Sequence, residues 1–284
     1  MIYTISNEYL EVKVKSFGAE LTSIKSKETG IEYLWQGDPN IWAGQSPILF
    51  PIIGRVLNDK YYLNSIEYSM MKHGFFRRRE ANLVAQNEAK ITFIEKDDAE
   101  TLKIYPYSFE VYVAYELVGK SVKSSYRVVN KNNNIMYFSI GGHPAFNCSI
   151  GDKIVFDNNE TLDTIGLDTE CLRNGKTYPV LNNENTIIIT KDIFNNDALI
   201  FNNVTSKNVT IESDNHNRKV RFDMGECPYL GIWAKPNAPY VCLEPWWGVD
   251  DDYIPRDDFS KKDCIQSLGA GKEFNCYWQV EIIE

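Results

Sequence analysis

Apolar and polar side chains alternate with a period of two along residues 109–140, and this alternation constrains the fold more than any other feature. Phe109 and Val111 fall on one face of an extended chain and Glu110 falls on the other, as in a half-buried β-strand. A Gly-Lys pair and the run "NKNNN" interrupt the alternation with turn-forming residues. The pattern predicts three consecutive antiparallel strands, at residues 109–117, 122–129 and 135–140.

Short strands of the same kind recur along the whole chain. Examples are "EYLEVKVKS", "AKITFIE", "NTIIIT", "ALIFNN", "NVTIES", "KVRFDM" and "FNCYWQVEII". Helical patterns are rare, and the best is "DAETLKIY" just before Pro106. Because strands follow one another without intervening helices, we expect an all-β fold, a large twisted antiparallel β-sandwich. No linker or repeat divides the chain, so we expect a single domain over residues 1–284, with a long loop from Asn158 to Thr186.

The composition excludes several classes of function. A net charge of −9 argues against general nucleic-acid binding, which requires a basic surface. The first residues lack the segments of a signal peptide, and no run approaches the ~20 apolar residues that span a bilayer. The six cysteines show no CxxC pair, which favours reduced thiols over disulfides or a zinc site. We therefore expect a cytoplasmic protein that binds neither nucleic acid nor membrane.

The stretch "IGGHPAFN" places His143 at the end of the third predicted strand. Gly141 and Gly142 allow close backbone approach, and Pro144 holds His143 in an extended or turn conformation. An imidazole at such a stiff strand end can act as a general acid or base. It can also simply hydrogen-bond its neighbours in a turn.

The stretch "YVCLEPWWG" places Glu244 inside an apolar run. In a strand, Cys242 and Glu244 share one face. A carboxylate among Cys, Leu, Pro and Trp should be partly desolvated, which raises its pKa and makes it a better base. The alternative is a buried carboxylate that serves a structural hydrogen bond, beside tryptophans that belong to the core.

Three further stretches combine charged and aromatic residues: "SPILFPIIGRV" with Arg55, "MKHGFFRRR" with His73, and "LGIWAKP" with Trp233. Each has a structural interpretation, since Arg55 can pair with a surface acid and the arginine run can form a solvated edge. Together with His143 and Glu244, they suit a cleft that binds a sugar. Aromatic faces contact the C–H side of a sugar ring, while charged groups and imidazoles bind its hydroxyls.

These motifs resemble those of the galactose mutarotase (aldose 1-epimerase) family. "IGGHPAFN" is similar to the family's His-Pro-x-Phe-Asn signature, and "GRV", "HGFFR" and "CLEPW" match family stretches in the same order along the chain. The forms of the HGF and EPW stretches are like those of the bacterial LacX-type epimerase-like proteins. The resemblance covers nearly the whole chain, and it implies the galactose mutarotase-like supersandwich of β-strands.

The resemblance also implies roles for individual residues. His143 matches the family's general acid, and Glu244 matches its general base. The positions that correspond to sugar-binding residues are Arg55, His73, Asp197 in "FNNDALIF" as the candidate aspartate, and Trp233 as a platform by position.

Anomer exchange requires only that a hemiacetal ring open and close again. One acid and one base suffice, without a metal, a nucleotide or a covalent intermediate. We therefore expect an isomerase without cofactor or metal, an aldose 1-epimerase (mutarotase) that interconverts the α and β anomers of a hexose. We expect it to be a monomer or a homodimer.

Three alternatives remain. The substrate can be a hexose 6-phosphate, gripped by Arg77 and Arg79 on one strand face together with Lys72 beside His73, although no glycine-rich phosphate cradle accompanies them. The chain can be a carbohydrate-binding or sensing module without significant turnover. A glycoside hydrolase usually needs two carboxylates, whereas only Glu244 sits in a convincing setting and Asp250–Asp252 indicates a polar loop.

Overall fold

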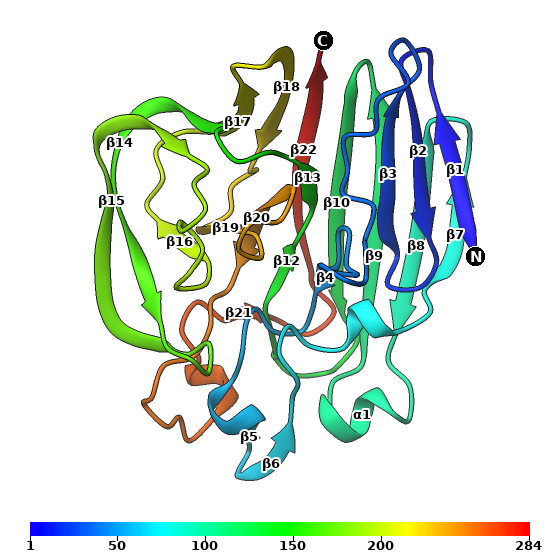
Figure 1. Ribbon diagram of the computed structural model, residues 1–284. Helices are drawn as coiled ribbons and strands as arrows, with labels where there is room; N and C mark the ends of the chain where they lie inside the picture. Colours follow the sequence, from blue (N-terminus) through cyan, green and yellow to red (C-terminus); the bar gives the residue numbers. More distant parts are fainter.

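A computed structural model describes all residues, 1–284, and strands dominate it (Figure 1). The strands of the largest sheet, in spatial order, are β15 (Arg173–Ile188), β14 (Lys153–Leu167), β17 (Asn208–Ser213), β18 (His216–Asp223), β22 (Glu273–Ile283), β10 (Ser121–Asn130), β9 (Phe109–Val118), β8 (Lys90–Lys96) and β7 (Asn82–Gln86). A second sheet contains β16 (Leu199–Asn202), β19 (Tyr229–Trp233), β20 (Tyr240–Trp247), β12 (Ile140–Gly142) and β4 (Ile48–Leu49), with β13 (Ala145–Asn147) also paired to β20. The strand pairs in both sheets are antiparallel, as predicted.

Smaller elements complete the fold. Three further sheets are formed by β1 (Ile2–Ser6), β2 (Leu10–Lys15) and β3 (Glu20–Ser26), by β11 (Met136–Phe138) with β21 (Gln266–Leu268), and by β5 (Lys60–Leu63) with β6 (Ile66–Ser69). The helical segments are α1 (Thr101–Ile104) and the 3-10 turns Leu57–Asp59, Phe76–Arg78 and Phe259–Lys261. The helix α1 lies within the predicted helical stretch. No helix is long and apolar enough to cross a membrane.

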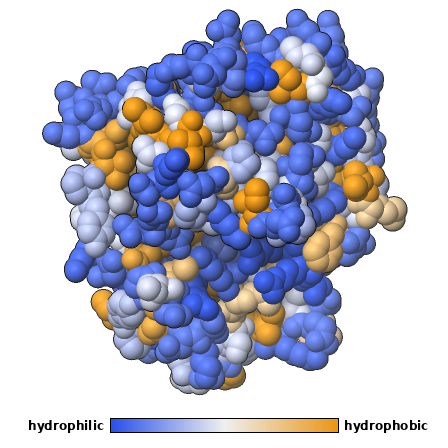
Figure 2. All heavy atoms as spheres, in the orientation of Figure 1, coloured by the Kyte–Doolittle hydropathy of each residue, from blue (hydrophilic) through white to orange (hydrophobic).

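The two large sheets pack face to face through aromatic side chains. Phe146 of β13 contacts Phe222 of β18 with ring centroids 5.9 Å apart, and Phe222 stacks on Trp278 of β22 at 5.4 Å. Alternate residues of β9 and β10 point into this layer and are buried, as the period-two pattern predicts. Hydrophilic residues predominate on the face drawn in Figure 2, where apolar side chains form small separate groups.

The third strand of the 109–140 stretch does not join the other two. β9 and β10 pair as predicted, but β11 pairs with β21, and β12 lies between β20 and β4 in the second sheet. The chain therefore crosses from one layer to the other after β10. At the end of β12, Gly142 lies against Trp278 and Tyr126 of the large sheet, where a Cβ atom would be only 2.7 Å from the indole nitrogen. His143 follows Gly142 directly, so this contact fixes where its backbone lies.

The prediction of a long loop from Asn158 to Thr186 is wrong. These residues belong to a hairpin of two long strands, β14 and β15, whose register shifts at several points. Much of β15 is exposed, so its polar sequence satisfies the backbone ladder without supplying a regular apolar face. The polarity of the segment therefore reflects exposure and not irregular structure. Figure 1 shows this hairpin standing at one side of the molecule.

We expect Gly142→Ala to destabilise the protein by about 1–3 kcal/mol, because the added methyl group overpacks the contact between the sheets. It would also press on the buried hydrogen bond from Trp278 Nε1 to Tyr126 Oη, which is 2.7 Å long. Urea unfolding measures the effect. The control is Gly269→Ala, whose Cβ would meet only Lys272 Cγ at 3.6 Å. Equal free energies of unfolding for the two variants would contradict this account of the contact.

Candidate active site

A cavity of about 870 Å³ contains both predicted catalytic side chains. His143 reaches it from the end of β12, where its backbone N–H donates to the carbonyl of Pro47 at 3.0 Å. Glu244 reaches it from the centre of β20, opposite Gly231 of β19. Both residues therefore stand on paired strands of the second sheet, which fixes their separation.

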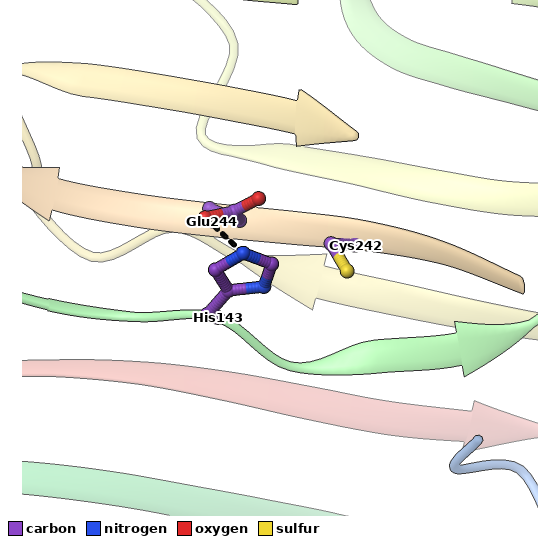
Figure 3. A group of neighbouring side chains, drawn as sticks. All are labelled: His143, Cys242 and Glu244. Carbon is purple, nitrogen blue, oxygen red and sulfur yellow. Dashed lines mark ion pairs between the residues drawn. The ribbon is translucent and has the colours of Figure 1, made fainter. Parts of the chain in front are cut away.

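His143 and Glu244 face one another directly (Figure 3). The imidazole Nε2 lies 3.3 Å from the carboxylate Oε2 of Glu244. Only 7% of His143 and 1% of Glu244 are exposed. Cys242, two residues before Glu244 on β20, lies on the same face of the strand, as predicted. The arrangement can pass a proton between a nitrogen and an oxygen in a site from which most water is excluded.

Aromatic rings hold the imidazole of His143 on three sides. The indole of Trp42 stacks on it with centroids 5.1 Å apart, and Trp233 and His73 approach edge-on at 5.6 and 5.8 Å. The Nδ1 atom of His143 is buried and has no hydrogen-bond partner in the protein. The ring is therefore fixed in orientation by packing, with Nε2 directed at Glu244 and Nδ1 enclosed by the protein.

His73 is clamped by a reciprocal pair of bonds to Gly54. Its backbone N–H donates to the Gly54 carbonyl at 2.6 Å, and the Gly54 N–H donates to His73 Nδ1 at 3.1 Å. Because Nδ1 accepts, the neutral imidazole carries its proton on Nε2. His73 lines the cavity, so it can offer that N–H to a sugar hydroxyl.

Burial dominates the protonation of the pair. It raises the pKa of Glu244 well above its ordinary value, against an opposing hydrogen bond from Trp246. Burial also lowers the pKa of His143 to about 3, with help from the nearby Arg77 guanidinium, and it lowers the pKa of His73. Desolvation therefore disfavours both charged forms of the pair. Over a broad pH range Glu244 and His143 together hold one titratable proton, so one member can donate and the other can accept.

Most of the other predicted site residues also line the cavity. Asp197, Trp233 and Arg77 do so together with His73. Asp197 has a positive φ of 74°, and its carboxylate accepts from the Ala198 N–H at 2.9 Å. This hydrogen bond orients the carboxylate of Asp197 at the cavity wall.

Arg55 and Arg79 do not line the cavity. The guanidinium of Arg55 binds Asp59 and Glu170, each at 2.8 Å, so its predicted contact with a sugar would require these ion pairs to open. Arg79 binds the buried Glu95 at 2.5 Å. The assumption that Arg77 and Arg79 share a strand face is wrong, because residues 76–78 form a 3-10 turn that separates their directions.

Two cavity residues, Trp42 and Asp250, were not predicted to belong to the site. Trp42, which lies before the second sheet, lines the cavity, as does Lys72, the predicted neighbour of His73. Asp250, which was predicted to lie in a polar loop, is also buried there, and its Oδ1 accepts from the Arg55 N–H at 3.1 Å. Its neighbour Asp251 forms a buried ion pair with Lys262, whose Nζ lies 2.6 Å from Asp251 Oδ1. Only the pairing of distant segments reveals these residues.

The donor atoms of His143, Cys242 and Glu244 lie within 4.8 Å of one another, and such a set can ligate a divalent metal. The cationic side chains of Lys72 and Arg77 face the same cavity and would repel a dication. The arrangement suits proton transfer better than metal binding.

The fold and these motifs are those of the aldose 1-epimerase family. The profile of that family matches residues 1–259, so the chain belongs to it. The chain is 37% identical over 265 residues to the plasmid form of protein LacX from Lactococcus lactis subsp. lactis, a match that covers 88% of each chain.

Solved structures confirm the predicted fold. A galactose mutarotase related enzyme from Lactobacillus acidophilus gives a TM-score of 0.95 at 32% identity, covering 100% of this chain and 98% of that one. A galactose mutarotase-like protein from Lactobacillus casei ATCC 334 gives 0.94 at 30% identity, covering both chains completely. The galactose mutarotase-like fold is therefore shared over the full length.

We expect Glu244→Gln to make the protein more stable at pH 8. Because burial raises the pKa of Glu244, the native protein loses stability as the pH rises from the ordinary carboxyl pKa of about 4.3 to the raised value. The glutamine variant avoids this loss. In that window its advantage grows by about 1.4 kcal/mol per pH unit, and it vanishes near pH 4.

Urea unfolding at pH 4, 6 and 8 measures this difference. The control is Glu273→Gln, which removes the same charge at a half-exposed position and should show no such trend. If the native protein is as stable as Glu244→Gln at pH 8, the carboxyl is not desolvated as described.

Proposed function

We propose that the protein is an aldose 1-epimerase in activity as well as in family, and that it interconverts the anomers of a free aldohexose. The observation that carries the proposal is the separation of 3.3 Å between His143 Nε2 and Glu244 Oε2 in a cavity walled by tryptophans. A pure binding site needs no matched donor and acceptor. Family membership alone does not establish turnover.

The proposed reaction has three steps. The Glu244 carboxylate takes the proton from the C1 hydroxyl while His143 gives a proton to the ring oxygen, so the C1–O5 bond breaks and an aldehyde forms. The C1–C2 bond then rotates. The ring closes on the other face of the carbonyl carbon, with His143 taking back a proton from the C5 hydroxyl and Glu244 returning one to the C1 oxygen. No net proton is gained or lost.

The remaining cavity groups would orient the sugar. Trp42 and Trp233 offer apolar surfaces beside His143, which suits the C–H face of a pyranose. His73 Nε2–H can donate to a hydroxyl, and the Asp197 carboxylate can accept from another. These groups bind a ring without taking part in the proton transfers.

The charge of the cavity favours a neutral sugar over a sugar phosphate. Its cationic residues are Lys72 and Arg77, whereas its acidic residues are Asp168, Asp197, Glu244 and Asp250. A phosphate dianion would have to overcome this excess of acidic groups. Arg77 lines the cavity and has no carboxylate within ion-pair distance; its Nη2 donates to the Lys72 carbonyl at 3.0 Å. The rest of its guanidinium can therefore donate to a hydroxyl, or to a phosphate if one is present.

We expect Glu244→Gln and His143→Asn each to reduce mutarotation about 10²–10⁴-fold, because each removes a proton-transfer group while keeping a polar side chain. Polarimetry of freshly dissolved glucose and galactose measures the rate, and calorimetry measures sugar binding, which both variants should retain. His216→Asn, at an exposed position, is the matched control. Native turnover of an aryl glycoside without anomer exchange would identify a hydrolase instead.

We expect the native protein to exchange the anomers of the neutral hexose at least as fast as those of its 6-phosphate. Arg77→Ala should raise the KM for the neutral sugar, since it removes a donor from the cavity wall. The control is Arg78→Ala, at the adjacent exposed position. A native preference of about tenfold or more for the phosphate, lost in Arg77→Ala only, would show that the substrate is a sugar phosphate.

A further inference from the structure

We infer that Trp246 is a positioning residue for Glu244, and that it determines which carboxylate oxygen is the base. The inference rests on the proposed function, because it assigns atoms within that reaction. In this assignment Oε2 is the anchored oxygen, and Oε1 takes the proton from the C1 hydroxyl.

Two bonding groups meet on the same oxygen. The indole Nε1–H of Trp246 donates to Glu244 Oε2 at 3.2 Å, and His143 Nε2 lies 3.3 Å from that same atom. Oε1 accepts no hydrogen bond from the protein, and it is not among the sealed polar atoms that lack a partner. The carboxylate therefore presents Oε1 to the cavity, where a sugar hydroxyl can reach it.

Two glycines make room for the indole of Trp246. On β19, a Cβ atom at Gly231 would lie 2.7 Å from Trp246 Cζ2, and on β12 a Cβ atom at Gly141 would lie 2.9 Å from Trp246 Cδ1. Gly231 pairs with Glu244 and Gly141 pairs with Trp246, so both glycines flank β20 at this point. With no side chain on either neighbour, the indole can lie along the sheet and turn its N–H back to Glu244.

The hydrogen bond also influences where the pair keeps its proton. An N–H donor stabilises the carboxylate and opposes the desolvation that raises the Glu244 pKa. The other titratable groups that face or neighbour this carboxyl are Lys72, Cys242, His143, Asp197 and Asp250. Lys72 also favours the carboxylate, whereas Asp197 and Asp250 oppose it. Trp246 thus shifts the shared proton toward His143, which is the direction required for Glu244 to act as the base and His143 as the acid.

The test is Trp246→Phe, which keeps an aromatic ring and removes the donor. The carboxyl titration of Glu244 is followed by infrared difference spectra against Glu244→Gln in the same background. We expect the titration in Trp246→Phe to move up by about one pH unit, since a hydrogen bond to the charged form is lost. We also expect kcat to fall about tenfold and KM to stay within about twofold of native.

Trp247→Phe is the matched control. It makes the same substitution on the next residue of β20, which is buried but does not line the cavity, and should leave the titration unchanged. Gly231→Ala is the second variant, because its methyl group would push the indole away from Glu244 while keeping the donor. It should reproduce the titration shift of Trp246→Phe.

Two results would overturn the inference: a native Glu244 titration in Trp246→Phe, or an equal shift in Trp247→Phe. If Gly231→Ala leaves the titration unchanged in a folded protein, the assigned role of the glycines is wrong. The titration is measured without sugar. A native protein without anomer exchange would therefore refute the proposed function, while the titration still decides whether Trp246 positions Glu244.

Discussion

The contact of Gly142 with Trp278 and Tyr126 is the constraint on which the rest of the site depends. Gly142 ends β12 of the second sheet, so close to the large sheet that only a residue without a Cβ atom fits between the layers. The next residue is His143, so the contact sets the height and direction of the imidazole. Because β12 pairs with β20, the same contact fixes the imidazole relative to Glu244. Packing between the layers thus fixes the distance between the two side chains that we propose to transfer protons.

Burial of this pair has opposite effects on stability and on chemistry. Taking a carboxyl and an imidazole out of water disfavours the charged form of each, which costs folding free energy at neutral pH for the carboxyl and at acidic pH for the imidazole. The same dry environment strengthens every remaining interaction, including the hydrogen bond from Trp246 to Glu244. A site of this kind is expected to be less stable than its neutral variants, as is common where function requires desolvated titratable groups.

The sequence predicted the fold class and the two residues that meet in the cavity, His143 and Glu244, because both leave local signals. Alternation marks the strands, and the glycines beside His143 and the apolar run around Glu244 mark the pair. It did not predict the partner of the third strand, which depends on the contact of Gly142 with distant Trp278. The exposed hairpin at residues 153–188 was missed because solvated strands need no apolar face. Trp42 was not predicted to belong to the site, because only folding brings it to the cavity.

The site divides into a rigid part and a variable part. His143 and Glu244, which we propose to transfer the protons, stand on or beside paired central strands, whose register hardly tolerates change. The cavity walls that would meet the rest of a sugar come from turns and from the β14–β15 hairpin, and they supply Arg77 and Asp197. Segments of this second kind accept substitution and insertion far more readily. If the proposed reaction is the one catalysed, relatives can keep its chemistry while changing the sugar, so the choice of sugar must be sought in the walls and not in the pair of His143 and Glu244.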